Sequence, residues 1–164
     1  LAATTLRFAK EGLPIVNKSD VRLCDFIEEV QVAAQPWFGE CVLRVNVEPG
    51  IVSSVDGTLL QRVLDNLIRN AVEAGASDIE ISWMDEEAAL RVCDDGRGLA
   101  PRAIENLFVP FAGSARPGGS GLGLPISRVL MRAQGGDLLL ESTGADGTCF
   151  LIMLAPHSFD TPTR

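Results

Sequence analysis

Residues 56–73, DGTLLQRVLDNLIRNAVE, form the stretch from which the rest of the fold can be predicted. Apolar side chains recur there at the three- and four-residue spacing of an amphipathic helix. They are Leu60, Val63, Leu64, Leu67, Ile68 and Ala71. Asp56 is placed to act as the N-cap of this helix, and Gly75 as its C-cap. The pattern predicts one central helix whose apolar side faces a core.

A strip of polar side chains runs along the same helix. Asn66, Asn70 and Glu73 follow one another at intervals of four and three residues, so their side chains stack on a single face. Two amides and a carboxylate in this arrangement suit a bound ligand. The same residues also occur by chance on the solvated flank of a surface helix, so the helix alone leaves both interpretations open.

Length and charge limit what this chain can be. Its 164 residues are enough for one domain with a two-layer core. A net charge of −8 argues against nucleic acid or an anionic membrane surface as the main partner, because both select for clusters of Lys and Arg. A phosphate ligand would need a cation beside it. No apolar run is long enough to cross a bilayer, and no signal-peptide pattern is found.

The four cysteines, Cys24, Cys41, Cys93 and Cys149, are scattered without CxxC spacing, each in an apolar or strand-like stretch. This usage predicts reduced, buried thiols in a cytosolic setting rather than a disulfide framework or a zinc site.

Hydrophobic patterning predicts helices and strands that are interleaved around one mixed sheet. The expected helices span residues 1–11, 25–34, 56–73, 101–107 and 122–133. The expected strands lie near residues 21–23, 41–48, 78–83, 88–93, 137–142 and 148–154. Asp25 and Glu28 form a capping box for the second helix, and Pro36 is expected to end it. The order indicates an α+β fold, a two-layer α/β sandwich with helices on one face of the sheet.

A first glycine motif, VCDDGRG at residues 92–98, comes where a strand stops. The carboxylate of Asp94 can accept a hydrogen bond from an exocyclic amine, and Gly96 and Gly98 allow the backbone to approach a flat ring. A polar turn is the alternative, because Asp-Gly pairs are common in turns.

A second motif, GGSGLGL at residues 118–124, opens the helix expected at 122–133. Backbone N–H groups at a helix N-terminus, without Cβ atoms around them, form an anion site suited to phosphates. The lysine of a P-loop is missing, and no GxGxxG follows the first strand. A flexible linker is the alternative, although linkers do not usually run straight into a periodic helix.

Taken in order, four motifs resemble the N, G1, F and G2 boxes of the ATP-binding domain of sensor histidine kinases. They are Asn66-x-x-x-Asn70, Asp94-x-Gly96-x-Gly98, LFVPF at residues 107–111 and GSGLGL at residues 119–124. Residues 147–150, GTCF, resemble the closing strand, and the likeness covers roughly residues 21–155. The superfamily also contains gyrase, the heat-shock ATPase chaperones and the mismatch-repair ATPases. The resemblance implies the Bergerat ATP-binding fold, with ATP and Mg²⁺ as ligands.

The resemblance assigns an expected role to individual residues. Asp94 would bind the adenine amino group, with Gly96 and Gly98 shaping the pocket floor. Thr148 belongs to the expected cofactor-binding set, as does Glu73.

The phosphate end of the ligand is expected at the central helix and the second glycine motif. Asn70 would hold Mg²⁺ against the triphosphate, and Asn66 would support the metal or the phosphates. Backbone donors would come from the G2 box, which comprises Gly119, Ser120, Gly121, Leu122, Gly123 and Leu124.

A short lid, residues 112–118, is expected between the F and G2 boxes, with Phe108 and Phe111 as its anchors. Its Arg116 is placed to reach the γ-phosphate and would join Asn66 and Asn70 in catalysis. An exposed loop charge is the alternative for Arg116, and the sequence does not decide between the two.

Glu73 departs from the family pattern, because many members have a Lys at this position and use it on the phosphates. The branch whose N box ends Asn-Ala-Val-Glu-Ala tolerates the change. We interpret Glu73 as local variation or as a partner of the metal's own ligands, so the departure affects how the triphosphate charge is balanced.

The residue one turn before the metal-binding Asn bears on the type of reaction. Members that hydrolyse ATP typically carry a Glu there, which activates water as a general base. This chain has Asn66, an amide that cannot take a proton, and the resemblance therefore implies phosphoryl transfer to another group. In sensor kinases the acceptor is a histidine on a separate two-helix dimerisation domain. His157, the single histidine here, is expected to be a solvated tail residue.

These inferences give the hypothesis of a sensor histidine kinase catalytic domain. Residues 1–18 would be a remnant of an upstream dimerisation helix and linker, residues 19–156 the catalytic domain and residues 157–164 a polar tail. The expected partners are that histidine-bearing domain and a response-regulator receiver domain. We expect a cytoplasmic domain without membrane contact, monomeric alone, in a homodimeric parent that could itself be membrane-anchored.

Two alternatives are kept. One is a serine kinase of the anti-sigma type, which shares the fold; a helix entering from an upstream domain argues against it. The other is a non-enzymatic module with a degenerate pocket, and the intact Asn70, Asp94 and second glycine motif argue against that.

Overall fold

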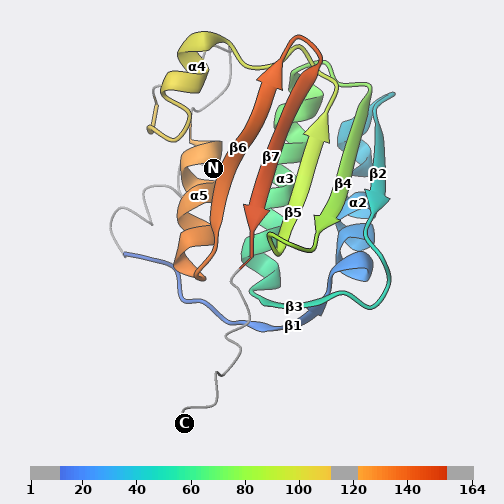
Figure 1. Ribbon diagram of the computed structural model, residues 1–164, viewed down its shortest axis with the longest axis vertical. Helices are drawn as coiled ribbons and strands as arrows, with labels where there is room; N and C mark the ends of the chain where they lie inside the picture. Colours follow the sequence, from blue (N-terminus) through green and yellow to red (C-terminus); the bar gives the residue numbers. More distant parts are fainter. Residues whose placement is uncertain (1–11, 112–121, 155–164) are drawn as a thin grey trace.

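The computed structural model describes residues 12–111 and 122–154, which form a main sheet with helices on one of its faces and a separate two-stranded sheet (Figure 1). The helices are α2 (Leu23–Phe38), α3 (Gly57–Glu73), α4 (Pro101–Glu105) and α5 (Gly123–Ala133). The strands are β1 (Ser19–Arg22), β2 (Val42–Asn46), β3 (Val52–Val55), β4 (Asp78–Met84), β5 (Ala89–Asp94), β6 (Asp137–Gly144) and β7 (Gly147–Met153).

The main sheet has five strands in the order β2-β4-β5-β7-β6. β2 pairs with β4 in parallel, whereas the other three pairings are antiparallel. α2 and α3 lie behind this sheet in Figure 1, and α5 packs beside α3 and β6. β1 and β3 form a separate two-stranded sheet. The predicted α+β two-layer fold with a mixed sheet is therefore confirmed.

The central helix predicted from residues 56–73 is α3. The Asp56 side chain accepts a hydrogen bond from Leu59 N at 3.1 Å, as an N-cap does, and Gly75 follows the helix with a φ of 78°. The apolar side is buried throughout, each side chain being at most 3% exposed: Leu60, Val63, Leu64, Leu67, Ile68 and Ala71. α3 is therefore a central element of the core.

The main sheet contributes alternate residues on the face toward the helices, and α2 and α5 add further core residues. Ile79 and Ile81 of β4 and Val92 of β5 are buried there, as are Phe150 and Ile152 of β7. The residues between them point to the opposite face, which the described helices leave uncovered (Figure 1).

The N-terminal part differs from the prediction in several places. Leu23 already belongs to α2, whose N-cap is Arg22, and no side chain caps the helix, so the predicted Asp25 capping box is wrong. Pro36 lies inside α2 instead of ending it. The helix continues past Pro36 because Phe38, 7% exposed, packs into the core. The cost is limited, since a proline in the last turn removes only one backbone hydrogen bond.

Strand β3 was not predicted either. Its sequence, VSSV, lacks apolar alternation, yet the structure buries Ser53 and Val55 on one side. β3 is held by its antiparallel pairing with β1.

The prediction of four reduced, buried cysteines is wrong for this structure. Cys93 and Cys149 form a disulfide, and Cys24 and Cys41 are free but only partly buried. Cys93 on β5 and Cys149 on β7 are register partners. Their separation of 56 residues hid this neighbourhood in the sequence.

Among the described residues, none of the helices has the length and apolar content to cross a membrane. The expected helix at 1–11 and the tail at 157–164 lie outside the described residues, and the proposed domain limits stay predictions.

The cap at the start of α3 carries a measurable share of the stability. Asp56 is 6% exposed, and its second oxygen accepts from Asn17 N at 2.8 Å. We expect Asp56→Ala to lower the free energy of unfolding by about 1–2 kcal/mol in urea denaturation, since a cap and a second hydrogen bond are lost. Asp56→Asn keeps one acceptor oxygen and should lose less. A loss well below about 1 kcal/mol in Asp56→Ala would contradict this contribution of the cap.

A close approach between two glycines gives a second test. A Cβ added to Gly98, whose φ is 80°, would lie 2.1 Å from the Gly144 carbonyl oxygen, whereas one added to Gly144 would meet nothing within 4 Å. Gly98→Ala should therefore destabilise the fold by at least about 2 kcal/mol, and the matched Gly144→Ala by less than about 1 kcal/mol. Urea unfolding of both variants measures the difference, and similar losses would contradict the observed packing.

Candidate functional site

The polar strip of α3 meets the start of α5 at Asn66. The Asn66 side-chain Nδ2 donates to Ser127 Oγ at 3.1 Å, and Ser127 is 2% exposed. A Cβ added to Gly123 would lie 2.1 Å from Asn66 Oδ1, so a residue without a side chain is needed for this approach. A cavity of about 80 Å³ lies here, lined by Arg62, Asn66, Leu122, Gly123, Ile126, Ser127 and Leu130. The described end of the second glycine motif, at Leu122 and Gly123, thus lies beside Asn66 of the N box.

The first glycine motif packs against the other end of α3. Asp94 is the last residue of β5, and its Oδ1 accepts a hydrogen bond from Gly96 N at 2.8 Å. A Cβ on Gly96 would come within 3.0 Å of both the Ala74 side chain and its carbonyl oxygen. The backbone N–H of Arg97 donates to that Ala74 oxygen at 3.2 Å. The loop is therefore fixed at Ala74, one residue beyond the C-terminal end of α3. Asn70 and Glu73 belong to the last turn of this helix.

Thr148 of β7 lies directly beside this loop. Asp94 and Thr148 are register partners, and Thr148 is 5% exposed. The hydroxyls of Thr148 and Thr143 are 2.9 Å apart, and the Leu99 backbone N–H donates to Thr143 Oγ1 at 2.9 Å. A Cβ on Gly147 would lie 1.8 Å from the Asp94 carbonyl oxygen. The ends of β5, β6 and β7 and the loop after Asp94 are consequently packed with little free space.

Three residues that shape the site were not singled out in the sequence. Asp95 accepts hydrogen bonds from Ser77 N and Asp78 N at 2.7 and 2.9 Å, which ties the loop to the start of β4. Ser127 and Thr143 have the contacts given above. Ser127 follows Gly123 by one helical turn, so its position at the site could have been inferred from that spacing. Thr143 reaches the site because it is the register partner of Thr148, which the sequence does not indicate.

Two arginines of α5 make contacts beyond their own helix, and one of them reaches the F box. The Arg128 guanidinium lies over the Phe108 ring, 4.4 Å from its centroid, and Arg128 Nε is 3.0 Å from Asp137 Oδ1. Arg132 Nε reaches the same oxygen at 3.1 Å. Burial opposes ionisation of Asp137, but the hydrogen bonds from Arg128, Leu138 N and Arg132 lower its pKa below the usual value. These contacts fix α5 against β6.

The remaining predicted site residues differ in how far they are exposed, and some of them lie outside the described residues. Glu73 is exposed, Asn70 is half-buried, and Leu122 is buried, with Leu124 in the first turn of α5. Phe111, expected to anchor the lid, is 72% exposed and has a φ of 63°. Arg116, Gly119, Ser120 and Gly121 lie outside the described residues.

Charge around the polar strip is mixed. Asp65 precedes Asn66, and within the described part of the chain its Oδ1 is buried without a hydrogen-bond partner. Burial raises the pKa of Asp65, and the Arg69 guanidinium offsets part of that rise. The described groups at the expected ligand positions also include the carboxylates of Asp94 and Glu73, and the guanidinium of Arg62 lines the cavity at Asn66.

The family model described as "Histidine kinase-, DNA gyrase B-, and HSP90-like ATPase" matches residues 55–158 of this chain. The match contains α3, the loop after Asp94, α5 and the last two strands. The family is one of ATPases, which identifies ATP as the nucleotide of this domain.

Among curated proteins, the chain is similar to the C4-dicarboxylate transport sensor protein DctB of Rhizobium meliloti, with 37% identity over 68% of this chain and 19% of DctB. It is also similar to the sensor histidine kinase AruS of Pseudomonas aeruginosa, with 33% identity over 88% of this chain and 16% of AruS. The chain thus spans less than a fifth of the length of these two relatives.

Among solved structures, the catalytic domain of histidine kinase ThkA superposes with a TM-score of 0.72 and 25% identity, over 85% of this chain and 95% of that one. The mycobacterial sensor histidine kinase MprB superposes with a TM-score of 0.68 and 26% identity, over 83% and 97%. With more than half of its length matched by the family model, this chain belongs to the family of histidine kinase-, DNA gyrase B- and HSP90-like ATPases.

Proposed function

We propose that this chain is the catalytic portion of a sensor histidine kinase, which transfers the γ-phosphoryl group of ATP to a histidine on a dimerisation domain outside the chain. The phosphoryl group would then pass to an aspartate of a response-regulator receiver domain. The observation that carries the proposal is the position of Asn66, whose amide is bonded to Ser127 at the start of α5. An amide cannot accept a proton from water, so this position favours transfer over hydrolysis.

The adenine end of ATP is assigned to the loop after β5. Asp94 supplies a carboxylate acceptor for the exocyclic amine, and the Gly96 N–H orients that carboxylate through its 2.8 Å bond to Oδ1. Gly96 and Gly98 admit no Cβ in their present contacts, so the loop backbone stays close to the pocket. Thr148, buried beside Asp94, completes this end.

The phosphate end is assigned to α3 and the start of α5. Asn70 and Asn66 offer the amide oxygens that suit Mg²⁺, and the ion would supply charge stabilisation during phosphoryl transfer. Gly123, the first residue of α5, lies against Asn66, and the free N–H groups at the start of a helix suit phosphate oxygens. Glu73 is assigned to the surroundings of the metal. Residues 119–124 would complete the phosphate contacts, with Arg116 reaching the γ-phosphate.

The partners and setting belong to the same proposal. We infer that residues 1–18 continue an upstream dimerisation helix and linker, that residues 19–156 are the catalytic domain and that residues 157–164 are a tail. The domain would work in the cytoplasm without touching a membrane, as a monomer when isolated and within a homodimeric parent.

Removing the Asp94 carboxylate tests the nucleotide pocket. We expect Asp94→Ala to weaken ATP binding about 5- to 150-fold, because a buried amine would lose its acceptor at a cost of about 1–3 kcal/mol. Calorimetric titration measures the change. Glu86→Ala removes the same charge from the exposed turn at the other end of β5, and it should bind ATP like the parent chain. Unchanged affinity in Asp94→Ala would refute the assignment of the pocket.

Phosphoryl transfer itself is tested by supplying an acceptor. A histidine-bearing two-helix domain from a related sensor kinase is incubated with this chain, ATP and Mg²⁺, and the product is assayed for acid and base stability. Acid-labile, base-stable phosphohistidine is expected, and it should disappear when Mg²⁺ is chelated and in Asn70→Ala. Phosphoserine would point to a serine kinase of the anti-sigma type. ATP binding without any transfer to several acceptors would point to a binding module.

A further inference from the structure

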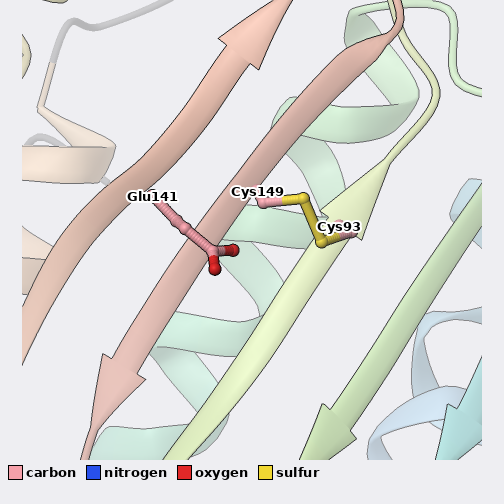
Figure 2. Close-up of side chains that lie close together, drawn as sticks. All are labelled: Cys93, Glu141 and Cys149. Carbon is pink, nitrogen blue, oxygen red and sulfur yellow. A yellow bond between two sulfur atoms is a disulfide. The ribbon is translucent and has the colours of Figure 1, made fainter.

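The outer face of the sheet carries a pair of bonded cysteines that the proposed phosphoryl transfer does not use. Figure 2 shows the Cys93–Cys149 disulfide in front of β5 and β7, with α3 behind these strands. The neighbours Val92 and Phe150 point the other way and are buried in the core. Both cysteines are partly exposed, so a small reagent can reach the sulfur atoms from the uncovered face.

The disulfide lies next to the adenine end of the proposed nucleotide site. Cys93 precedes Asp94, and Cys149 follows Thr148, so two successive register pairs of the β5–β7 ladder are the disulfide pair and the site pair. Beyond the site pair the ladder stops, because the chain leaves β5 into the glycine loop and enters β7 from a turn at Gly147. The covalent bond therefore clamps the last rungs of the ladder.

We propose that Cys93 and Cys149 are a reversible thiol–disulfide exchange site, whose reactants are small disulfides and thiols of the glutathione class, and that the oxidised form binds nucleotide more tightly. The second half of the proposal rests on the proposed function and on a cytoplasmic setting. Disulfides in that compartment are usually transient and redox-sensing rather than structural.

The small disulfide, RSSR, is the only reactant that the exchange needs from outside the chain. The thiolate of one cysteine attacks a sulfur of the disulfide RSSR, the RS–SR bond breaks, and RS⁻ leaves as a mixed disulfide forms. The second cysteine loses its proton to solvent and attacks the protein sulfur of that mixed disulfide, releasing a second RS⁻. Two protein thiols are oxidised, and one RSSR is reduced to two RSH.

The surroundings favour reaction at this pair over the other cysteines. Cys24 and Cys41 are in no disulfide, and burial followed by nearby carboxylates raises the pKa of each thiol, which disfavours the reactive thiolate. At the disulfide, Glu80 of β4 is the register partner of Cys93, and the carboxylate of Glu141 of β6 lies beside the sulfur atoms. Its charge is countered by Arg91 of β5, whose Nε is 2.6 Å from Glu141 Oε2.

The coupling to nucleotide follows from the position of the clamp. Without the bond, the last rungs of the ladder depend on hydrogen bonds and packing at the point where pairing ends, so Asp94 and Thr148 gain freedom that binding must remove. Coupling between two sites is reciprocal. If the disulfide raises nucleotide affinity, bound nucleotide raises the equilibrium constant for disulfide formation by the same factor.

The exchange site is tested without nucleotide. The variant with Cys24→Ser and Cys41→Ser is equilibrated in glutathione buffers that range from reducing to oxidising ratios. Each titration is started once from the reduced protein and once from the oxidised protein. Free thiols are then alkylated, and the masses of the products are measured by mass spectrometry. We expect one two-electron transition that is identical from both directions, with the protein folded throughout. A disulfide that glutathione cannot reduce in the folded protein, or two thiols that never pair, would overturn the exchange site.

The coupling is tested by titrating ATP with Mg²⁺ into the oxidised and reduced forms of the same double variant. We expect about fivefold or greater tightening on oxidation, the low end of typical coupling between sites, and an equal shift of the glutathione midpoint when ATP is present. In the matched variant with Cys93→Ser and Cys149→Ser, the affinity should equal that of the reduced form and ignore glutathione. Equal affinities in both forms, or tighter binding by the reduced form, would overturn the coupling.

Failure of the proposed function has a different signature. Absence of ATP binding in both redox forms would overturn the proposed function together with the coupling. The exchange site would still be decided by the glutathione titration, which contains no nucleotide.

Discussion

The packing of α3 against the sheet is the contact on which the other features depend. Leu60, Leu64 and Ile68 are fully buried on the sheet side of this helix, so its rotation about its own axis is fixed. With the rotation fixed, the helical period sets where Asn66 and Asn70 emerge. A slip of one residue would turn both amides toward another neighbour. The ligand face of α3 is therefore specified by the apolar residues on its other side.

The site is assembled from segments that are distant in the sequence, and glycines make the assembly possible. Gly123 admits the Asn66 amide at the start of α5, Gly96 admits Ala74 at the end of α3, and Gly147 lies against the Asp94 carbonyl. An added side chain would push the partners apart by more than an ångström at Gly123 and Gly147, and by a few tenths of an ångström at Gly96. The glycines thus set distances between elements, which is a different task from the flexibility that glycine-rich sequences often indicate.

The sequence was sufficient where structure is determined locally. The period of residues 56–73 predicted α3 with its cap, and the alternation around Ile79 and Ile81 predicted the β4–β5 hairpin. Sequence reasoning failed where tertiary contacts decide. Pro36 ends helices by local rules, but the burial of Phe38 carries α2 past it. The disulfide required strand register across a separation of 56 residues, which no spacing of cysteines indicates.

The candidate site shows the same division. Asp94 and Gly96 were recognisable as a motif, because carboxylate and glycines are adjacent in the chain. That Thr148 is the register partner of Asp94, and that Thr143 fixes the loop through Leu99, follows from the order β5-β7-β6, which patterning along single strands does not give. The structure therefore adds Thr148 and Thr143, which lie around the loop, to the Asp94 motif that was recognisable in the sequence.

The chemistry at Asn66 follows from its neighbours rather than from its own side chain alone. Its Nδ2–H bonds to Ser127, which orients the amide and leaves Oδ1 on the side of Gly123. A carboxylate in this position would have no N–H to donate, and its charge would repel an approaching triphosphate. The neutral amide removes both the repulsion and the general base. In the proposed function, Asn66 therefore cannot supply a base that assists the transfer. A residue of the acceptor domain can supply that base.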